Sequence, residues 1–336
     1  MRLSESTIKK SENLALMRFF ASIFVILGHS YAISGSPLKY DFVYRGTGEI
    51  ISLGGICVSL FFICSGYLIT RSMGRVDKFL PYIKARLKRL VPPLAFVVVL
   101  TVIAGIFLTT VSVKEYFTSS KTYVYLLNAV MLTNQYLPGV FENNVFGPSV
   151  NGALWTLPVE LACYVACYIF YKTKLLNPKR FYFTAPIVVL ALVFEGYIPS
   201  VFGDMVRPCA FFYVGMLYYV YREKIVLNVK LLPVVILALV GAFFVKPLII
   251  PALIVLWPYA LFTIWFALPQ CPKLLGKTGD ISYGIYLWGF FVQQTLVFLW
   301  GGSMPQIINF CLSAVISIVL GTVTFLITEK PLQKKK

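Results

Sequence analysis

Long apolar segments recur along this 336-residue chain, and they constrain its fold more than any other feature. A helix needs about 20 apolar residues to cross the hydrocarbon of a bilayer. Hydrophobic residues make up 59% of the chain and charged residues 13%, against the roughly 25% charged residues of soluble domains. This composition excludes a disordered chain, and 7 Cys spread over such a length exclude a small disulfide scaffold. The sequence therefore predicts a membrane protein.

The apolar segments predict an all-α, polytopic fold with about ten transmembrane helices in a single domain over 1–336. An even number of spans places both termini on the same side of the membrane. The expected helices are residues 14–34, 50–70, 90–111, 153–171, 181–200, 203–221, 231–246, 248–268, 280–300 and 305–328.

Lys and Arg number 30 against 13 Asp and Glu, which gives a net charge of +17. This excess fits either nucleic-acid binding or membrane topology, because cytoplasmic loops of membrane proteins collect Lys and Arg. The basic residues are concentrated on alternate connections, above all on the second, which holds Arg71, Arg75, Lys78, Lys84, Arg86, Lys88 and Arg89. We therefore expect both termini in the cytoplasm and no nucleic-acid partner. The basic tail at 329–336 is suited to contact anionic membrane lipids.

The longest connection on the extracytoplasmic side is residues 112–152. Its apolar part, Tyr123 to Leu132, is too short to span a bilayer, which predicts a re-entrant or an interfacial segment. Long ordered connections tend to be functional. This connection lies where an external acceptor would dock.

Arg18, His29 and Glu160 lie inside expected spans, where a titratable group is costly and marks a candidate site. Arg18 and His29 are eleven residues apart, so on a helix they share one face about 16.5 Å apart. The rise per residue predicts that Glu160 lies at the depth of His29, and that Ser65 lies nearer the cytoplasm with Arg18. An arginine at the cytoplasmic mouth suits a phosphorylated ligand. An imidazole suits proton abstraction from a hydroxyl, with a carboxylate to orient it.

Each of these residues also has a purely structural interpretation. Arg18 can extend to the membrane surface, His29 can pack between helices, and Glu160 can serve as a hydrogen bonder within the bundle. The chain has 1 His, which argues against a multi-His metal site. Cys163 and Cys167 share a helix face, and such cysteines are usually small core residues. We therefore expect no metal cofactor.

Six short sequence elements, which occur in order between Leu14 and Leu332, resemble those of the acyltransferase-3 family of integral membrane acyltransferases. The shared elements are Arg-x10-His at 18–29, FFxxSG at 61–66, Arg-x-x-Arg at 86–89, LWTLPVE at 154–160, GDISYGIYLW at 279–288 and Glu-Lys-Pro at 329–331. Two positions depart from the family pattern. Many members carry His after the YLW triplet, where this chain has Gly289, and the family's Ser in LWSL is Thr156, which keeps a hydroxyl.

The resemblance implies an acyl-CoA-dependent O-acyltransferase, most often an O-acetyltransferase of bacterial surface glycans, with several passes through the bacterial cytoplasmic (inner) membrane. It implies His29 as the general base and Glu160 as the group that orients it. The acceptor is expected to be a polysaccharide or lipid-linked glycan that contacts Asn151 and Trp155. Cytoplasmic acetyl-CoA would place its phosphates on arginines and its arm beside Ser65, and the expected donor-binding residues are Arg18, Ser65, Arg71, Arg86 and Arg89.

Two other classes of protein stay open at this point. A transporter or flippase of lipid-linked sugars would use the buried polar residues to line a permeation route, although we find no inverted repeat. A membrane scaffold of a glycan-assembly complex would need no polar site at all. Acetyl transfer by the purified protein discriminates between these classes. The sequence also leaves open the acyl chain, the modified hydroxyl, the oligomeric state and whether an acyl-enzyme forms.

Overall fold

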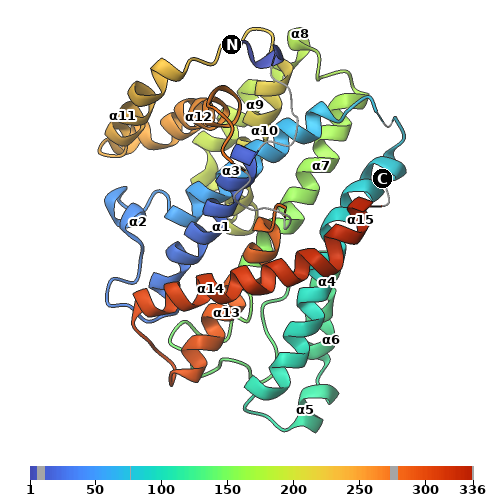
Figure 1. The fold of residues 1–336 in the computed structure, drawn as a ribbon, viewed down its shortest axis with the longest axis vertical. Helices are drawn as coiled ribbons and strands as arrows, with labels where there is room; N and C mark the ends of the chain where they lie inside the picture. Colours follow the sequence, from blue (N-terminus) through green and yellow to red (C-terminus); the bar gives the residue numbers. More distant parts are fainter. Residues whose placement is uncertain (6–11, 76, 273–278, 335–336) are drawn as a thin grey trace.

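The computed structural model describes residues 1–336 except 6–11, 76, 273–278 and 335–336 (Figure 1). The described chain is helical, and within these ranges β-pairing is limited to two isolated bridges, Arg2 with Val226 and Thr109 with Val140. The all-α class is confirmed. Several of the basic residues expected at the cytoplasmic face lie outside the described residues, namely Lys9, Lys10, Lys273, Lys277, Lys335 and Lys336.

Each of the expected apolar segments contains a helix. The helices are α1 (Glu12–Ile33), α3 (Leu53–Arg71), α4 (Phe79–Leu108), α7 (Thr156–Lys172), α9 (Ala185–Val193), α10 (Ser200–Val220), α11 (Leu232–Ala242), α12 (Lys246–Phe262), α13 (Ser282–Leu299) and α14 (Gln306–Thr324). Short helices lie between or after them, namely α2 (Phe42–Gly46), α5 (Val113–Thr118), α6 (Ser120–Leu126), α8 (Pro178–Phe181) and α15 (Lys330–Lys334).

By length and composition, 6 stretches of the described chain can cross a membrane. They are Glu12–Ile33, Leu53–Arg71, Phe79–Leu108, Gly152–Lys172, Lys246–Ala267 and Gln306–Leu332. The continuous helix expected over 181–200 is wrong, because a 3-10 turn at Glu195–Tyr197 ends α9 after 9 residues. Nine residues rise only about 13.5 Å, less than half of a hydrocarbon core of about 30 Å.

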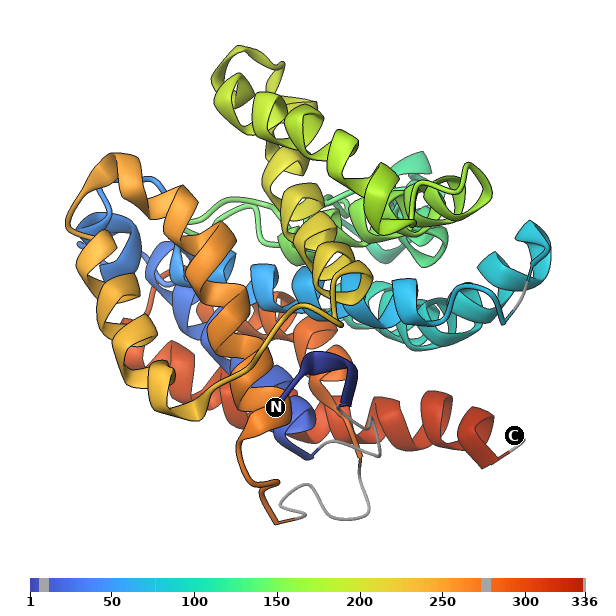
Figure 2. The ribbon, with the colours of Figure 1, turned by 90° about the horizontal axis from the view of Figure 1, so that it is seen from above.

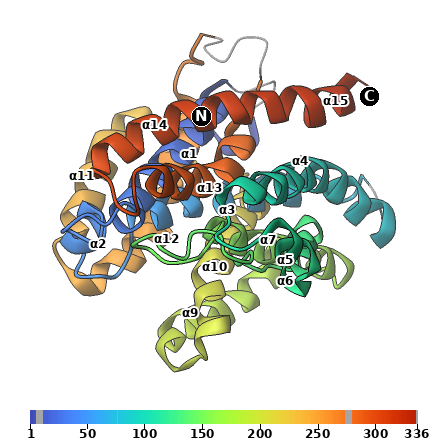
Figure 3. The same ribbon diagram turned by 90° about the horizontal axis from the view of Figure 1, so that it is seen from below.

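Helix α3 lies in the interior of the bundle and packs against α1, α7 and α10. Helices α13 and α14 pack against each other and against the other side of α1. The views from above and below show α14 and α15 along one face of the molecule and α9 projecting from the opposite face (Figures 2 and 3). The residues of the FFxxSG element therefore face the centre of the molecule rather than its surface.

Two glycines set the crossing of α3 and α10. A Cβ added at Gly66 would overlap the carbonyl oxygen of Phe212 and lie 3.2 Å from the Cα of Gly215. A Cβ at Gly215 would lie 2.8 Å from the backbone nitrogen of Tyr67 and closer still to the carbonyl oxygen of Ile63. Neither position leaves room for a side chain, so the two backbones touch directly beside Ser65.

The 112–152 connection is ordered against the long helices. The hydroxyl of Tyr116 in α5 donates to the carbonyl of Val102 in α4 at 2.9 Å, and burial raises the pKa of Tyr116 to about 12. Farther along, the Asn144 amide donates to the Gln294 carbonyl at 2.9 Å, and the Gln294 amide donates to the Ser149 carbonyl at 2.8 Å. Helices α5 and α6, with 6 and 7 residues, are each too short to span a bilayer.

Candidate active site

One cavity, of about 90 Å³, collects several of the predicted polar residues. Its lining includes Arg18 from α1, Ser65 from α3, Arg89 from α4 and Glu160 from α7. Phenolic side chains, Tyr164, Tyr283 and Tyr286, and apolar side chains of α3 complete the wall. We call this space the Arg18 cavity.

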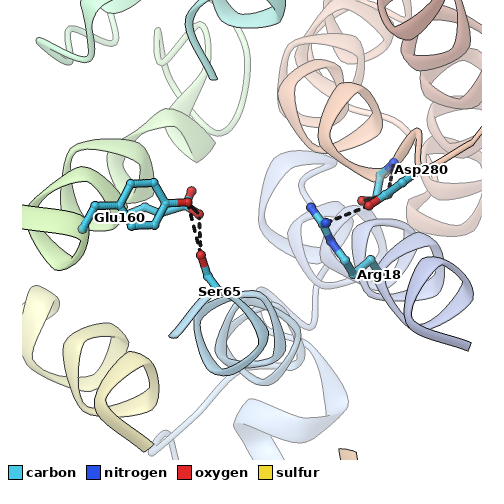
Figure 4. Close-up of polar contacts among 6 residues, drawn as sticks. Arg18, Ser65, Glu160 and Asp280 are labelled. Carbon is cyan, nitrogen blue, oxygen red and sulfur yellow. Dashed lines mark hydrogen bonds and ion pairs between the residues drawn. The ribbon is translucent and has the colours of Figure 1, made fainter. Parts of the chain in front are cut away.

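Glu160 and Ser65 contact each other in the Arg18 cavity (Figure 4). The Ser65 hydroxyl donates to Oε1 of Glu160 at 3.0 Å, and the Tyr164 hydroxyl, one turn along α7, donates to the same oxygen. The sequence places Glu160 level with His29, whereas in the structure Glu160 lines the cavity of Arg18 and Ser65, and His29 lines a different cavity.

Arg18 forms an ion pair with Asp280, which lies two residues before the start of α13, with 2.7 Å between Nη1 and Oδ2 (Figure 4). Asp280 also accepts a hydrogen bond from the backbone nitrogen of Ser282 at 3.2 Å, which fixes the carboxylate. The Arg18 guanidinium lies 5.6 Å from the centre of the Phe61 ring. Asp280 had no predicted role, and its place in the GDISYGIYLW element was the signal that could have found it.

The predicted phosphate-binding arginines divide into two groups. Arg18 and Arg89 line the Arg18 cavity, whereas Arg71 and Arg86 are not part of its lining. The Arg86 guanidinium stacks on the Tyr82 ring at 3.9 Å, and its Nη1 donates to the Tyr82 carbonyl at 3.0 Å. Its Nη2 donates to the Ser72 hydroxyl. Arg86 therefore already holds the end of α3 against α4.

The turn between α3 and α4 is also held to α7 by an exposed pair. The Lys172 ammonium lies 2.8 Å from Oδ1 of Asp77. This hydrogen bond and the positive charge hold the pKa of the Asp77 carboxyl below its usual range. Together with Arg86, the pair holds the basic connection to α4 and α7.

A second cavity, of about 330 Å³, has His29 in its wall, and we call it the His29 cavity. His29 is half-buried, and its ring packs edge-on against Phe290 with 5.5 Å between the ring centres. Trp155, directly before α7, is exposed and lines the same cavity. The structure therefore brings together the predicted base and one of the two predicted acceptor contacts.

The two cavities meet at Val58 and Tyr286, which line both. The Tyr286 hydroxyl donates to the Ala153 carbonyl at 2.8 Å and lies 2.8 Å from the Thr156 hydroxyl. These contacts fix the ring at the boundary between the cavities. Tyr286 lies in the GDISYGIYLW element and had no predicted role of its own.

Asn151, the other predicted acceptor contact, is buried and is not part of the His29 cavity wall. Its amide donates to the Leu287 carbonyl at 2.8 Å, so it ties the end of the long connection to α13.

Cys163 and Cys167 are buried, as expected for core residues, and the Cys163 sulfur lies 3.7 Å from that of Cys209. Among the described residues, no three His, Cys, Asp or Glu side chains are grouped so that they could hold a metal ion.

The comparisons with known proteins agree with the motifs. A family model described as an acyltransferase domain matches residues 12–327. This chain belongs to the acyltransferase-3 family, and its long apolar helices make it a membrane acyltransferase. It is also similar to the O-acetyl transferase of Shigella phage Sf6, with 29% identity over 340 residues that cover 96% of each protein. No solved structure matches the chain.

Proposed function

We propose that this protein is an O-acetyltransferase that moves an acetyl group from cytoplasmic acetyl-CoA to a hydroxyl of a cell-surface or lipid-linked polysaccharide. The family and the phage relative support acyl transfer to oxygen. The observation that carries the proposal is the pair of cavities that meet at Val58 and Tyr286, one with arginines and one with His29. This arrangement suits a donor and an acceptor that approach from opposite sides.

The Arg18 cavity has the chemistry expected for the donor. Arg18 and Arg89 offer planar guanidinium groups, which bind phosphate in a bidentate manner. Phe61 and Leu68 give the same space an apolar wall suited to the acyl-bearing arm. A cavity of about 90 Å³ is too small for a whole nucleotide, so the nucleotide stays at the cytoplasmic entrance. Arg71, at the end of α3, and Arg86 add positive charge near that entrance.

His29 is the proposed general base. It takes the proton of the acceptor hydroxyl while the oxygen attacks the thioester carbonyl, and the carbon–sulfur bond then breaks. The proton passes to the leaving sulfur, so that CoA departs as a thiol. A positioned base of this kind contributes about 10²–10⁴-fold to the rate.

Glu160 has its proposed role in the Arg18 cavity rather than beside His29. It accepts hydrogen bonds from Ser65 and Tyr164, and its charge balances the nearby arginines. The carboxylate thus orders the wall along which the acyl-bearing arm lies. This differs from the role that the resemblance implied, which was to orient the imidazole.

We place the protein in the bacterial cytoplasmic membrane, with several passes and both termini in the cytoplasm. The long apolar helices and the concentration of basic residues on alternate connections support this topology. The basic tail would then contact anionic lipids. Cysteines placed one at a time in the connections and labelled from outside the cell test this orientation.

Charge reversal on α4 tests the donor site. Arg89→Glu should weaken acetyl-CoA binding about tenfold or more, since it replaces a charge-assisted contact with repulsion. The matched control is Lys88→Glu, because Lys88 is the preceding residue and is not part of either cavity wall. Calorimetric titration of both purified variants with acetyl-CoA makes the measurement. Equal affinity in Arg89→Glu and Lys88→Glu would count against the proposed donor site.

The transporter alternative is tested with the same preparations. The purified wild-type protein should transfer radiolabelled acetyl from acetyl-CoA to polysaccharide isolated from cells that lack its gene. A flippase would move lipid-linked sugars and leave acetyl-CoA intact. Loss of label from acetyl-CoA without its appearance in polysaccharide would contradict the proposed acceptor class.

A further inference from the structure

The His29 cavity and the Arg18 cavity carry opposite excess charges. Apart from His29, the charged groups that the described residues place in the His29 cavity wall are the carboxylates of Glu195 and Asp204 and the guanidinium of Arg207. The wall of the Arg18 cavity has the reverse balance, with two guanidinium groups and one carboxylate, and one of the two, Arg18, is paired through Nη1 with Asp280 outside that wall. The positive charge of the Arg18 cavity suits the anionic donor, so the charges of the His29 cavity indicate the chemistry of the acceptor.

Arg207 is already occupied by contacts within the protein. Its Nε donates to Oε2 of Glu195 at 2.9 Å, and its Nη1 donates to the carbonyl of Ile50. These contacts neutralise Glu195 and tie α10 to the segment that leads into α3. Arg207 is therefore not free to bind an anionic group of the acceptor.

Asp204 is the carboxylate that remains. It lies one turn before Arg207 on α10, it is exposed, and it lines the His29 cavity. Within the described part of the chain, Asp204 has no hydrogen bond or ion pair to another side chain. An unpaired carboxylate is an acceptor for hydrogen bonds from ligand hydroxyls.

Aromatic side chains complete this part of the wall. Trp155 is 38% exposed and Tyr44 also lines the cavity. The face of an aromatic ring packs against apolar C–H surface, and a few polar groups in such a pocket fix the ligand's orientation. Sugars present both an apolar C–H face and several hydroxyl donors, so this wall matches them.

We infer that Asp204 and Trp155 form the acceptor subsite, and that the sugar residue acetylated there is uncharged. Asp204 accepts hydrogen bonds from the sugar hydroxyls, and Trp155 packs against the ring. An acidic sugar or a phosphorylated one would place a second anion beside Asp204, and the described residues of this cavity wall offer no unpaired cation to offset it. Such like-charge contacts disfavour the wrong partner. This inference rests on the proposed function.

The first test locates the ester. Wild-type protein acetylates polysaccharide isolated from cells that lack the gene, and NMR identifies the modified residue. We expect the acetyl group on a neutral sugar. An acetyl ester on a uronic acid, a sialic acid or a phosphorylated sugar overturns the inference.

The second test changes the subsite itself. Asp204→Asn should raise the KM for the same polysaccharide about tenfold, the usual size of a lost charged hydrogen bond, with the acetyl-CoA affinity unchanged. The matched control is Glu223→Gln, an exposed carboxylate just beyond the other end of α10, which should behave as wild type. An Asp204→Asn variant with an unchanged polysaccharide KM overturns the inference.

The two proposals fail in different ways. If the wild-type protein transfers no acetyl group to polysaccharide, the proposed function falls and the inference falls with it. If the wild-type protein transfers acetyl but Asp204→Asn matches Glu223→Gln, the inference alone falls. A thermal unfolding curve for each variant shows that a changed KM reflects binding rather than folding.

Discussion

The close crossing of α3 and α10 makes Gly66→Ala the most informative perturbation of the fold. The added Cβ would lie 2.9 Å from the carbonyl carbon of Phe212. Non-bonded carbons rest roughly 3.5–4.0 Å apart, so the two helices must separate by about 1 Å. Overpacking of this kind typically costs about 1–3 kcal/mol, and contact with backbone rather than with a movable side chain places Gly66→Ala near 3 kcal/mol.

The separation should also impair activity. Ser65 precedes Gly66 and donates to Glu160 across the Arg18 cavity at 3.0 Å, so a shift of α3 lengthens this hydrogen bond. Misplacement of a site by about 1 Å can cost roughly 10²-fold in rate. We therefore expect a melting temperature in detergent that is lower by about 4 °C, together with a large loss of acetyl transfer.

Two comparisons make the prediction sharp. Gly241→Ala, in α11, meets nothing within 4 Å and should be neutral or stabilising by about 0.5–1 kcal/mol. The double variant Gly66→Ala with Gly215→Ala should be destabilised by less than the sum of the single changes, because one separation relieves both overlaps. A Gly66→Ala protein as stable as Gly241→Ala, or strictly additive single changes, would refute the reasoning.

Two further predictions concern the ion pair of Arg18 and the junction between the two cavities. Arg18→Gln should lower both the melting temperature and the acetyl-CoA affinity. Adding Asp280→Asn should restore the melting temperature alone, because it removes the unpaired carboxylate but does not supply a cation for the donor. Recovery of both quantities in the double variant would assign Arg18 a purely structural role. Val58→Trp should fill the junction beside Tyr286, so that acetyl-CoA still binds while the rate of acetyl transfer falls by at least about 10²-fold. A normal rate of transfer in this variant would show that the acyl group takes another route.

The sequence predicted the parts of the fold that depend on local hydrophobicity. Apolar segments long enough to span the membrane, such as the one that forms α3, are visible without knowledge of any partner. The break after α9 was not predicted, although the 3-10 turn that ends the helix contains Glu195 and Gly196, which interrupt the apolar residues on either side. A hydropathy average over the length of a span conceals an interruption as short as this one.

The sequence predicted the site in part, because local patterns identify single polar residues but not the partners that these residues contact. Arg18 and His29 stand out because titratable groups are rare within spans, and both line cavities. Their partners come from distant segments, as with Asp280 for Arg18, and no spacing rule reports such a contact. Arg86 seemed equivalent to Arg89, but the Tyr82 carbonyl and the Ser72 hydroxyl occupy its guanidinium.

The most direct measurement compares acetyl transfer and acetyl-CoA binding in His29→Ala. The chain has 1 His, so no other imidazole can replace it. If His29 is the base, transfer falls by about 10²–10⁴-fold while the dissociation constant for acetyl-CoA stays within about twofold of wild type. A folded His29→Ala protein that transfers acetyl to polysaccharide at the wild-type rate would contradict the proposed mechanism.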